Sequence, residues 1–303
     1  MIVLLSIINI LIIPLLLIGV IRKVKALMQN RVGAPVFQAF YDVGKLLRKS
    51  ETISGTASWV FSLAPILNLA VVLIAALLVP WSGAGMPASW GGASNFLLII
   101  YLLGLGKFIS MLAAMDTGSA FGGLGASREA SISLMVEPAL MIGLGALAVG
   151  ARSMNLSTIY ASPSSQFVAI LVGASFVVAA LAELSRMPVD DPTTHLELTM
   201  VHEAMILENS GRNLALIELS VAMRTCIFFG LAAQTLLHAI PRYMELSQLS
   251  RYGIGLSSLF AMGMIVAVAE GVLVKLRWRR VSNFVAFAIA LSLLAALIAV
   301  AGG

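Results

Sequence analysis

The feature that most constrains the fold of this chain is a series of long apolar runs, each able to cross a lipid bilayer. Hydrophobic residues make up 60% of the 303 residues and charged residues only 11%. A helix of about 20 apolar residues spans the hydrocarbon core, and a backbone in lipid must satisfy its own hydrogen bonds. We therefore predict an all-α polytopic membrane protein with about eight transmembrane helices, at 2–21, 60–80, 96–115, 133–150, 166–184, 213–238, 252–274 and 281–301.

The loops between these runs differ in their content of basic residues. Fourteen of the 19 Lys and Arg residues lie in the loops after the first, third, fifth and seventh spans, and three lie in the other loops. Cytoplasmic loops carry such an excess, so we expect a protein of the cell inner membrane with both termini on the non-cytoplasmic side. The formal charge of +5 then indicates topology, with anionic lipid rather than nucleic acid as partner. No repeat or linker divides the chain, and 1–303 is expected to be a single membrane domain.

The segment "APVFQAFYDVGKLLRKSE" in the first basic loop is amphipathic. At helical spacing its apolar side chains fall on one side and its polar side chains on another. We predict an amphipathic helix that lies in the membrane interface, and simple surface anchoring is the alternative to a specific role for it.

Ionisable residues inside membrane spans are costly and usually face a polar interior or an ion pathway. The candidates are Lys107, Glu137, Glu183, Glu218, Arg224 and Glu270. Lys107 has no acid beside it in the sequence, and we consider Glu137 or Glu218 as its partner. Glu270 lies one turn before "KLRWRR", so a pair with a basic residue of that segment is expected. Buried carboxyls can take up and release protons near neutral pH, and a line of them with trapped water can relay protons.

The stretch "LAELSRMPVDDPTTHLELTMVHEAMILENSGR" (181–212) concentrates acidic residues in an otherwise oily chain. Asp191 and Pro192 can start a helix and "NSG" can end it, which predicts a helix of roughly 17 residues. Its polar side chains fall on two opposite sides, whereas a solvated surface helix has one polar face. We predict a helical cytoplasmic loop packed among other helices, with an ordinary solvated helix as the alternative.

A glycine-rich segment, "FGGLGASREASISL", precedes the fourth span. It lacks the Lys-Ser/Thr pair of a phosphate-binding loop and follows no predicted strand. We predict a flexible re-entrant loop that leads into the span.

Few residues in the sequence could hold a metal or a cluster. Cys226 is the only cysteine, whereas an iron–sulfur cluster needs about four ligands. The segment "HEAMI" begins like the zinc-protease motif and lacks its second histidine. We expect neither a metal nor another cofactor in this chain.

Three motifs, in order along the chain, resemble the subunit-1, or H-type, membrane protein of respiratory complex I. "QNRVGAPVFQAFYDVGKLLRKSE" is similar to Q-x-R-x-G-P followed by Q-x-x-x-D-x-x-K-L-x-x-K-E, with one residue inserted before Pro35. "SREASISLMVE" resembles R-x-x-x-x-x-x-S-x-E, and "AELSRMPVDDPTTHLELTMVHEAM" resembles A-E-x-x-R-x-P-F-D-x-x-E-x-E-x-E-L. "PTTHLE" departs from the "EGE" of complex I. With "GLGASREAS" and "NSGRNLALIEL", it resembles the homologous subunit of energy-converting hydrogenases of the formate hydrogenlyase type.

The resemblance to the hydrogenase branch implies a non-catalytic subunit that anchors a cytoplasmic nickel–iron hydrogenase arm and couples it to proton translocation. The implied partners are hydrogenase large and small subunits, iron–sulfur subunits and antiporter-like membrane subunits, and these partners would hold the nickel–iron centre and the iron–sulfur clusters. The residues implied on the proton path are Glu137, Glu183, Glu197, Glu203, Glu218, His195 and Lys107. Those implied at the cavity mouth or the arm contact are Arg31, Asp42, Lys45, Arg128, Arg186 and Asp190. Arg186 is expected to be the counter-charge of Glu183 or Asp190.

Two other functions fit the same sequence. One is the quinone-site membrane subunit of complex I (NADH:quinone oxidoreductase), because the same cavity helps to form its quinone chamber. The other is a passive membrane anchor whose acidic residues only hold loops together.

Overall fold

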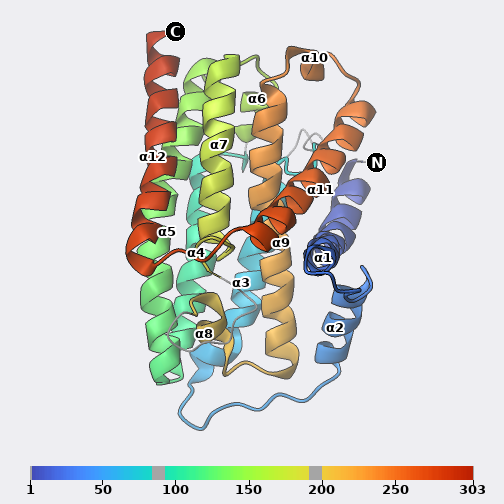
Figure 1. Ribbon diagram of the computed structural model, residues 1–303, viewed down its shortest axis with the longest axis vertical. Coiled ribbons are helices and arrows are strands. Elements are labelled where there is room, and N and C mark those ends of the chain that lie inside the picture. Colours follow the sequence, from blue (N-terminus) through green and yellow to red (C-terminus); the bar gives the residue numbers. More distant parts are fainter. Residues whose placement is uncertain (1, 84–92, 191–199, 303) are drawn as a thin grey trace.

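The computed structural model describes residues 2–83, 93–190 and 200–302, and these ranges contain no β-strand (Figure 1). Twelve helices account for most of the described residues. In chain order they are α1 (Ile2–Met28), α2 (Gln38–Leu47), α3 (Trp59–Leu78), α4 (Phe96–Asp116), α5 (Ala120–Ala151), α6 (Leu156–Ile159), α7 (Gln166–Glu183), α8 (His202–Ile206), α9 (Gly211–His238), α10 (Pro241–Met244), α11 (Gln248–Val272) and α12 (Trp278–Ala301).

Seven of these helices are long and apolar enough to cross a membrane: α3, α4, α5, α7, α9, α11 and α12. Each corresponds to one of the predicted spans, and α1 covers the first predicted span and continues to Met28. The prediction of an all-α polytopic membrane protein with about eight transmembrane helices is therefore confirmed. The helices α2 and α8 lie at one end of the bundle, and α6 and α10 lie at the other (Figure 1). We call these the α2/α8 end and the α6/α10 end.

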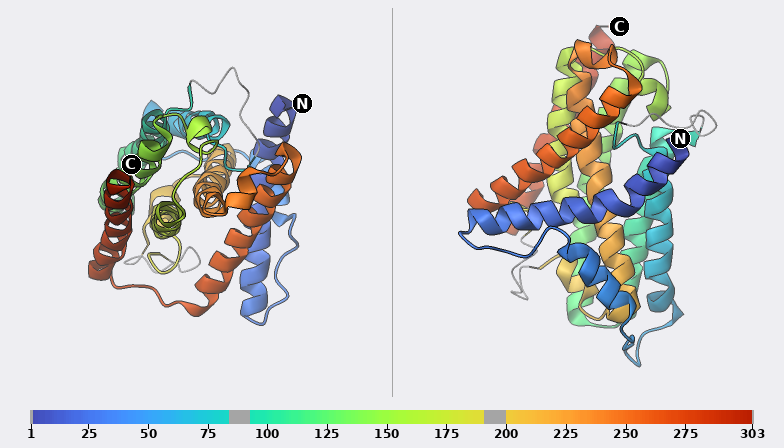
Figure 2. Two further views of the ribbon diagram at one scale, coloured as in Figure 1. Left: turned by 90° about the horizontal axis from the view of Figure 1, so that it is seen from above. Right: turned by 90° about the vertical axis from the view of Figure 1, so that its right-hand side faces the viewer.

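The helix α9 lies at the centre of the bundle and is the most buried of the seven candidate spans. It packs against α3, α7 and α11, and also against α1 and α2. In Figure 2 (right), α1 runs across the direction of the bundle, with α11 oblique beside it. This arrangement brings the polar end of α1 and the amphipathic α2 against the same central helix.

The predicted re-entrant loop before the fourth span is wrong, because α5 is helical from Ala120 to Ala151. The glycines of this segment serve close packing. A Cβ on Gly122 would lie 2.4 Å from the carbonyl oxygen of Ala114, and one on Gly125 would lie 2.8 Å from that of Val201. Small residues allow helices in membranes to approach closely, so a glycine pattern that suggests flexibility marks a helix contact here.

The two predictions for the cytoplasmic loops have different outcomes. The amphipathic helix exists as α2, and it buries Ala39 and Val43. The single helix predicted between Asp191 and the "NSG" sequence is wrong at its described end, because Met200 and Val201 are not helical and α8 has only five residues. The Val201 amide donates to Asp190 Oδ2 at 3.0 Å, so the backbone is tied to a side chain there instead of continuing a helix.

Candidate functional site

Four ionisable side chains from four helices meet inside the bundle. They are Lys107 of α4, Glu129 of α5, Glu183 at the end of α7 and Arg224 of α9, and none is more than 8% exposed. Lys107 Nζ forms ion pairs with the Glu129 carboxylate and, at 3.4 Å, with Glu183 Oε1. Lys107 also donates to the backbone carbonyl of Glu183 at 2.8 Å. We call these four residues the central charge cluster.

The surroundings explain how these charges can be buried. Two cations and two carboxylates balance each other, and a buried ion pair needs close partners of opposite charge. Glu183 is the last residue of α7, so Lys107 also meets a helix C-terminus, which attracts a cation. Arg224 Nη2 donates to Asn68 Oδ1 at 3.3 Å. A Cβ on Gly106 would lie within 2.9 Å of both atoms of that hydrogen bond, so a residue larger than glycine would push α4 away from the cluster.

Two cavities adjoin the cluster and share part of their walls. The first has a volume of about 50 Å³, which is enough for at least one water molecule. The Oε2 atoms of Glu129 and Glu183 are buried and have no hydrogen-bond partner in the described part of the chain. The second cavity measures about 560 Å³ and lies between the first cavity and α2. Six residues line both cavities, and Ser185 and His202 are the polar ones. These two polar side chains and four apolar ones therefore separate the large cavity from the small cavity beside the central charge cluster.

A second group of charges lines the large cavity. The Glu270 carboxylate, with a fully buried side chain, pairs with Arg186 Nη1 at 3.2 Å and with Lys25 Nζ at 3.4 Å. Asp190 pairs with Lys275. The predicted pairs of Arg186 with Glu183 or Asp190, and of Glu270 with the segment that follows it, are therefore wrong. The reason is that α1, α11 and the segment that follows α7 meet here, and sequence proximity does not indicate which segments meet.

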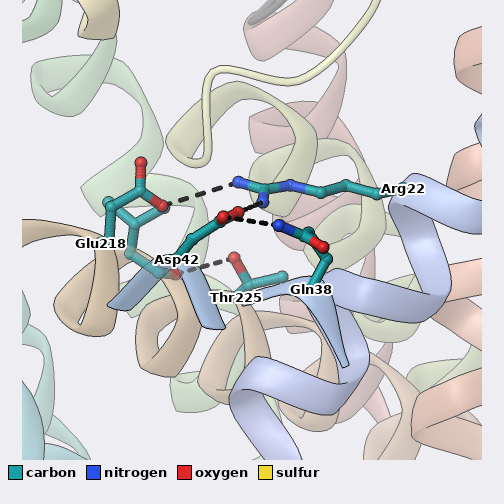
Figure 3. Close-up of polar contacts among 6 residues, drawn as sticks. Arg22, Gln38, Asp42, Glu218 and Thr225 are labelled. Carbon is teal, nitrogen blue, oxygen red and sulfur yellow. Dashed lines mark hydrogen bonds and ion pairs between the residues drawn. The ribbon is translucent and has the colours of Figure 1, made fainter. Parts of the chain in front are cut away.

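A third group lies at the wall that α1, α2 and α9 form around the large cavity. Arg22 of α1 pairs with Asp42 Oδ2 of α2 at 3.4 Å and with Glu218 Oε2 of α9 at 3.7 Å. Gln38 donates to Asp42 Oδ1 at 2.8 Å. Figure 3 shows the Arg22 guanidinium with contacts to both carboxylates, and the Gln38 amide on the same side of Asp42 as that guanidinium. We call Arg22, Asp42 and Glu218 the wall cluster.

The His202 side chain lies where the two cavities adjoin, at the start of α8. Burial, with the positive charges of Lys107, Arg224 and Arg186, lowers the pKa of His202 from 6.5 to about 3. The imidazole is therefore neutral at pH 7. A neutral imidazole has one donor and one acceptor nitrogen, so His202 can hydrogen-bond groups in both cavities at once.

The structure brings some of the predicted site residues together and separates others. Of the predicted set, Lys107 and Glu183 belong to the central charge cluster, and the large cavity is lined by Asp42, Lys45, Arg186, Asp190, Glu203 and Glu218. Glu137 lies further along α5, within electrostatic reach of Lys107 and Glu183. The direct ion-pair partners of Lys107 are Glu129 and Glu183 rather than Glu137 or Glu218, while Glu137 interacts with Lys107 at longer range.

Four predicted residues lie apart from the cavities or outside the described ranges. Arg128 donates to the Met200 carbonyl at 3.1 Å, lies over the Trp278 ring and lines neither cavity. Arg31 is exposed and also lines neither. His195 and Glu197 lie outside the described residues.

The site predicted from the sequence omits three residues that the geometry makes central: Lys25, Glu129 and His202. Arg224 is among the intramembrane candidates, but the sequence gives it no place on the predicted path. Glu129 is missing from it because a loop is predicted over its segment. Continuing the helical period back from the fourth span puts Glu129 on the α5 face that also holds Ser133 and Val136, which are both buried. The helical spacing of Glu129, Ser133 and Val136 in the sequence could therefore have identified Glu129 as a site residue.

The arrangement can hold and move charge, and it offers no metal site in the part of the chain that is described. No group of three or more His, Cys, Asp or Glu residues gathers among these residues in a way that could bind a metal ion. Carboxyls, a lysine and a neutral histidine beside water-sized space can exchange protons over hydrogen-bond distances. The chemistry that the site supports is proton transfer rather than covalent catalysis.

Helices of spanning length around buried charges define a multi-pass membrane protein with an internal polar site. The family profile described as NADH dehydrogenase matches residues 1–301, and the chain belongs to this family.

Curated relatives come from both branches that the motifs resemble. The chain is 30% identical over 217 residues to formate hydrogenlyase subunit 4 of Escherichia coli (strain K12), which covers 70% of this chain and 69% of the relative. Hydrogenase-4 component C of the same organism is also 30% identical over 217 residues, covering 70% and 67%. The H-type membrane protein of the NADH-quinone oxidoreductase of Bacillus thuringiensis (strain Al Hakam) is 29% identical over 224 residues, covering 70% and 65%.

A solved structure has the same fold. A chain of the membrane-bound sulfane sulfur reductase, an archaeal respiratory membrane complex, superposes with a TM-score of 0.78 and 17% identity, covering 98% of this chain and 99% of that one.

Proposed function

We propose that this chain is the membrane anchor and proton-coupling subunit of a hydrogenase complex, linking a cytoplasmic nickel–iron arm to ion translocation in the membrane. The similarity to formate hydrogenlyase subunit 4 and hydrogenase-4 component C supports the hydrogenase branch. The observation that carries the coupling role is that the large cavity and the small cavity beside the buried central charge cluster are neighbours that share His202 in their linings. The chain itself is a non-catalytic subunit, and the nickel–iron centre and iron–sulfur clusters belong to its partners.

The proposed proton route starts at the large cavity and ends deep in the bundle. Glu203 and Glu218 line the cavity, and His202 connects it to the small cavity. There, Lys107 bridges Glu129 and Glu183. A proton that neutralises one of these carboxyls weakens its pair with Lys107 and strengthens the other pair, because the ammonium lies between them. The cluster can therefore pass charge along without a large movement of backbone.

The orientation and the partners follow from the same proposal. The α2/α8 end faces the cytoplasm and the hydrogenase arm, with Arg31 and Arg128 available for contact with it. Both termini lie on the far side of the cell inner membrane. The arm consists of hydrogenase large and small subunits with iron–sulfur subunits, and antiporter-like subunits pack beside the chain in the membrane.

A second candidate function is the quinone-site subunit of an NADH:quinone oxidoreductase. The size of the large cavity, about 560 Å³, supports it, because sites for small organic molecules measure about 300–1,000 Å³. The similarity to the H-type membrane protein of NADH-quinone oxidoreductase supports it as well. Copurified subunits discriminate between the two: a nickel–iron subunit supports the first function, and an NADH-oxidising arm supports the second.

The experiment that tests coupling uses the purified complex in proteoliposomes. Glu129→Gln and Glu137→Gln are compared with Glu51→Gln, a change at an exposed residue of the first basic loop. We expect hydrogen evolution to continue in Glu129→Gln and Glu137→Gln while proton uptake or release falls by about tenfold or more, a typical loss for a proton-transfer group. Subunit content is measured in parallel. Fully coupled activity in both of these variants, with normal assembly, would favour the passive anchor instead.

A further inference from the structure

A third cavity lies at the α6/α10 end of the bundle, opposite the site described above (Figure 1). It measures about 270 Å³ and is formed by the end of α3, α6, the end of α9, α10 and the start of α11. Its polar side chains among the described residues are those of Ser157, Tyr160, Gln234, His238, Tyr243, Gln248 and Arg251. None of the proposed proton-path residues lines it.

The cavity has nitrogen atoms that no neighbour satisfies. Gln234 Nε2, His238 Nε2 and Arg251 Nε are buried and have no hydrogen-bond partner in the described part of the chain. Gln234 and His238 are each only 5% exposed. Leaving a buried polar group unpaired is costly. The Gln234 amide nitrogen and the Arg251 guanidinium are donors, so these two groups on one cavity indicate a ligand that accepts hydrogen bonds.

The orientation of Gln234 is fixed by its neighbours. The Tyr243 hydroxyl lies 3.0 Å from Gln234 Oε1 and 3.3 Å from the Arg251 carbonyl oxygen. Its shorter hydrogen bond, to Gln234 Oε1, leaves Nε2 as the free donor. Burial raises the pKa of Tyr243, so the phenol keeps the proton that it donates. A Cβ on Gly83 or Gly255 would lie within 3.1 Å of that amide nitrogen, and these two glycines therefore make the room in which the amide sits.

The charges of the residues that line the cavity indicate which class of ligand it can bind. Arg251 supplies a positive charge, and no Asp or Glu of the described residues lines this cavity. Glu245, at the end of α10, is exposed and outside the lining. An arginine with neutral donors around it favours an oxyanion, because guanidinium and N–H groups match phosphate oxygens.

The position of the cavity at the ends of the membrane-spanning helices also favours an oxyanion as the ligand. Tyr160 and Tyr243 flank it at the helix ends, and tyrosines are enriched where membrane spans meet the headgroup region. We propose that this cavity binds a phosphate group, held by Arg251 and Gln234, and that the group is either the phosphodiester of an anionic phospholipid or a free phosphate ion. The binding site is independent of the proposed coupling function.

Two variants and one control test this site on the full chain purified in a neutral detergent. Arg251→Gln removes the charge. Gln234→Glu keeps the size and the acceptor for Tyr243 but replaces the free donor by an acceptor. Arg242→Gln is the matched control, because Arg242 is an exposed arginine of α10 at the same end and does not line the cavity. Circular dichroism and the unfolding midpoint show whether each variant is folded, and Gln234→Glu carries the test where Arg251→Gln fails to fold.

Binding is measured by calorimetry with short-chain phosphatidylglycerol, the matching diacylglycerol without phosphate, and inorganic phosphate. We expect binding of a phosphate-bearing probe to weaken about tenfold or more in both variants, as for loss of a charge-assisted hydrogen bond, and to be unchanged in the control. Binding of phosphatidylglycerol alone identifies a lipid headgroup, and equal binding of inorganic phosphate identifies a free ion. Absence of binding by either phosphate probe, diacylglycerol binding as tight as that of phosphatidylglycerol, or equal losses in Arg251→Gln and Arg242→Gln would overturn the proposal.

Discussion

The central charge cluster and the wall cluster consist of similar residues in opposite surroundings. Both pair a basic side chain with two carboxylates contributed by other helices. In the central charge cluster, the side chains of Lys107, Glu129 and Glu183 are at most 6% exposed. In the wall cluster, those of Arg22, Asp42 and Glu218 are 39–47% exposed. The same ion-pair chemistry therefore contributes differently to stability and to motion in the two places.

The difference follows from the cost of taking charges out of water. A buried ion pair that loses one partner leaves an uncompensated charge, at a cost of about 3–5 kcal/mol. A solvent-exposed pair contributes only about 0–1 kcal/mol. The central charge cluster is therefore fixed in its place between four helices, whereas the wall that α2 forms against α1 and α9 can open at little cost in ion pairing. The large cavity therefore has one wall, formed by α2, that can move at little cost in ion pairing, and one end, at the central charge cluster, that buried ion pairs hold in place.

Lys107→Met should have the largest effect on stability. It leaves the carboxylates of Glu129 and Glu183 buried beside each other without their shared cation, so the free energy of unfolding should fall by about 3–5 kcal/mol. The measurement is a denaturant titration of the purified chain in detergent. Lys45→Met, at an exposed lysine of α2, is the control. Equal stability of Lys107→Met and the control would mean that the two carboxyls are protonated and need no cation.

Arg186→Met should have an intermediate effect. Glu270 keeps Lys25 as a partner, so its charge is not left alone, and the loss is that of one hydrogen bond to a charged group, about 1.5–3 kcal/mol. The same titration measures it, with Arg31→Met as the control at an exposed arginine. A loss as large as that of Lys107→Met would show that Lys25 does not compensate, and that Arg186 is the main counter-charge.

The fold could be predicted from the sequence, because the bilayer imposes it locally. A run of about 20 apolar residues specifies a spanning helix without knowledge of its neighbours, and the helices α3, α4 and α7 begin and end within about two residues of the predicted spans, inside the usual error. The amphipathic pattern of α2 is equally local. The prediction failed where glycine has two meanings: in "GGLG" it serves close packing of α5 and does not break the helix.

The site could be predicted only in part, because its pairs join helices that are distant in the sequence. Intramembrane position alone singled out Lys107 and Glu183. Their partner Glu129 and the pair of Glu270 with Lys25 depend on how the helices pack, since Lys107 and Glu129 are 22 residues apart and Lys25 and Glu270 are 245 apart. Sequence proximity predicts an ion pair between near neighbours such as Arg186 and Glu183. In the folded chain Arg186 instead pairs with Glu270 of α11.

His202 connects the two regions, and its titration gives a smaller, pH-dependent effect. Its pKa is about 3 in the folded chain and 6.5 ordinarily, so between these values the unfolded chain binds a proton that the folded chain does not. Stability should therefore fall as the pH falls below 6.5, by about 1 kcal/mol between pH 6.5 and 5.5. The measurement compares unfolding at both values for the wild type and His202→Gln. The variant should lose that part of the pH dependence, and an unchanged difference would assign the dependence to another group.

The smallest effect is expected in the wall cluster. Arg22→Met removes pairs at 3.4 and 3.7 Å, and all three side chains keep contact with solvent. A double-mutant cycle with Asp42→Asn should therefore give a coupling energy of about 0.2–1 kcal/mol, lower at high salt because exposed charges are screened. Val43, on the buried face of the same helix, provides the contrast, since Val43→Ala should cost more than either change without any salt dependence. A coupling of several kcal/mol that salt does not change would mean that α2 shields Arg22 from water. The α2 wall of the large cavity would then be held as firmly as the central charge cluster.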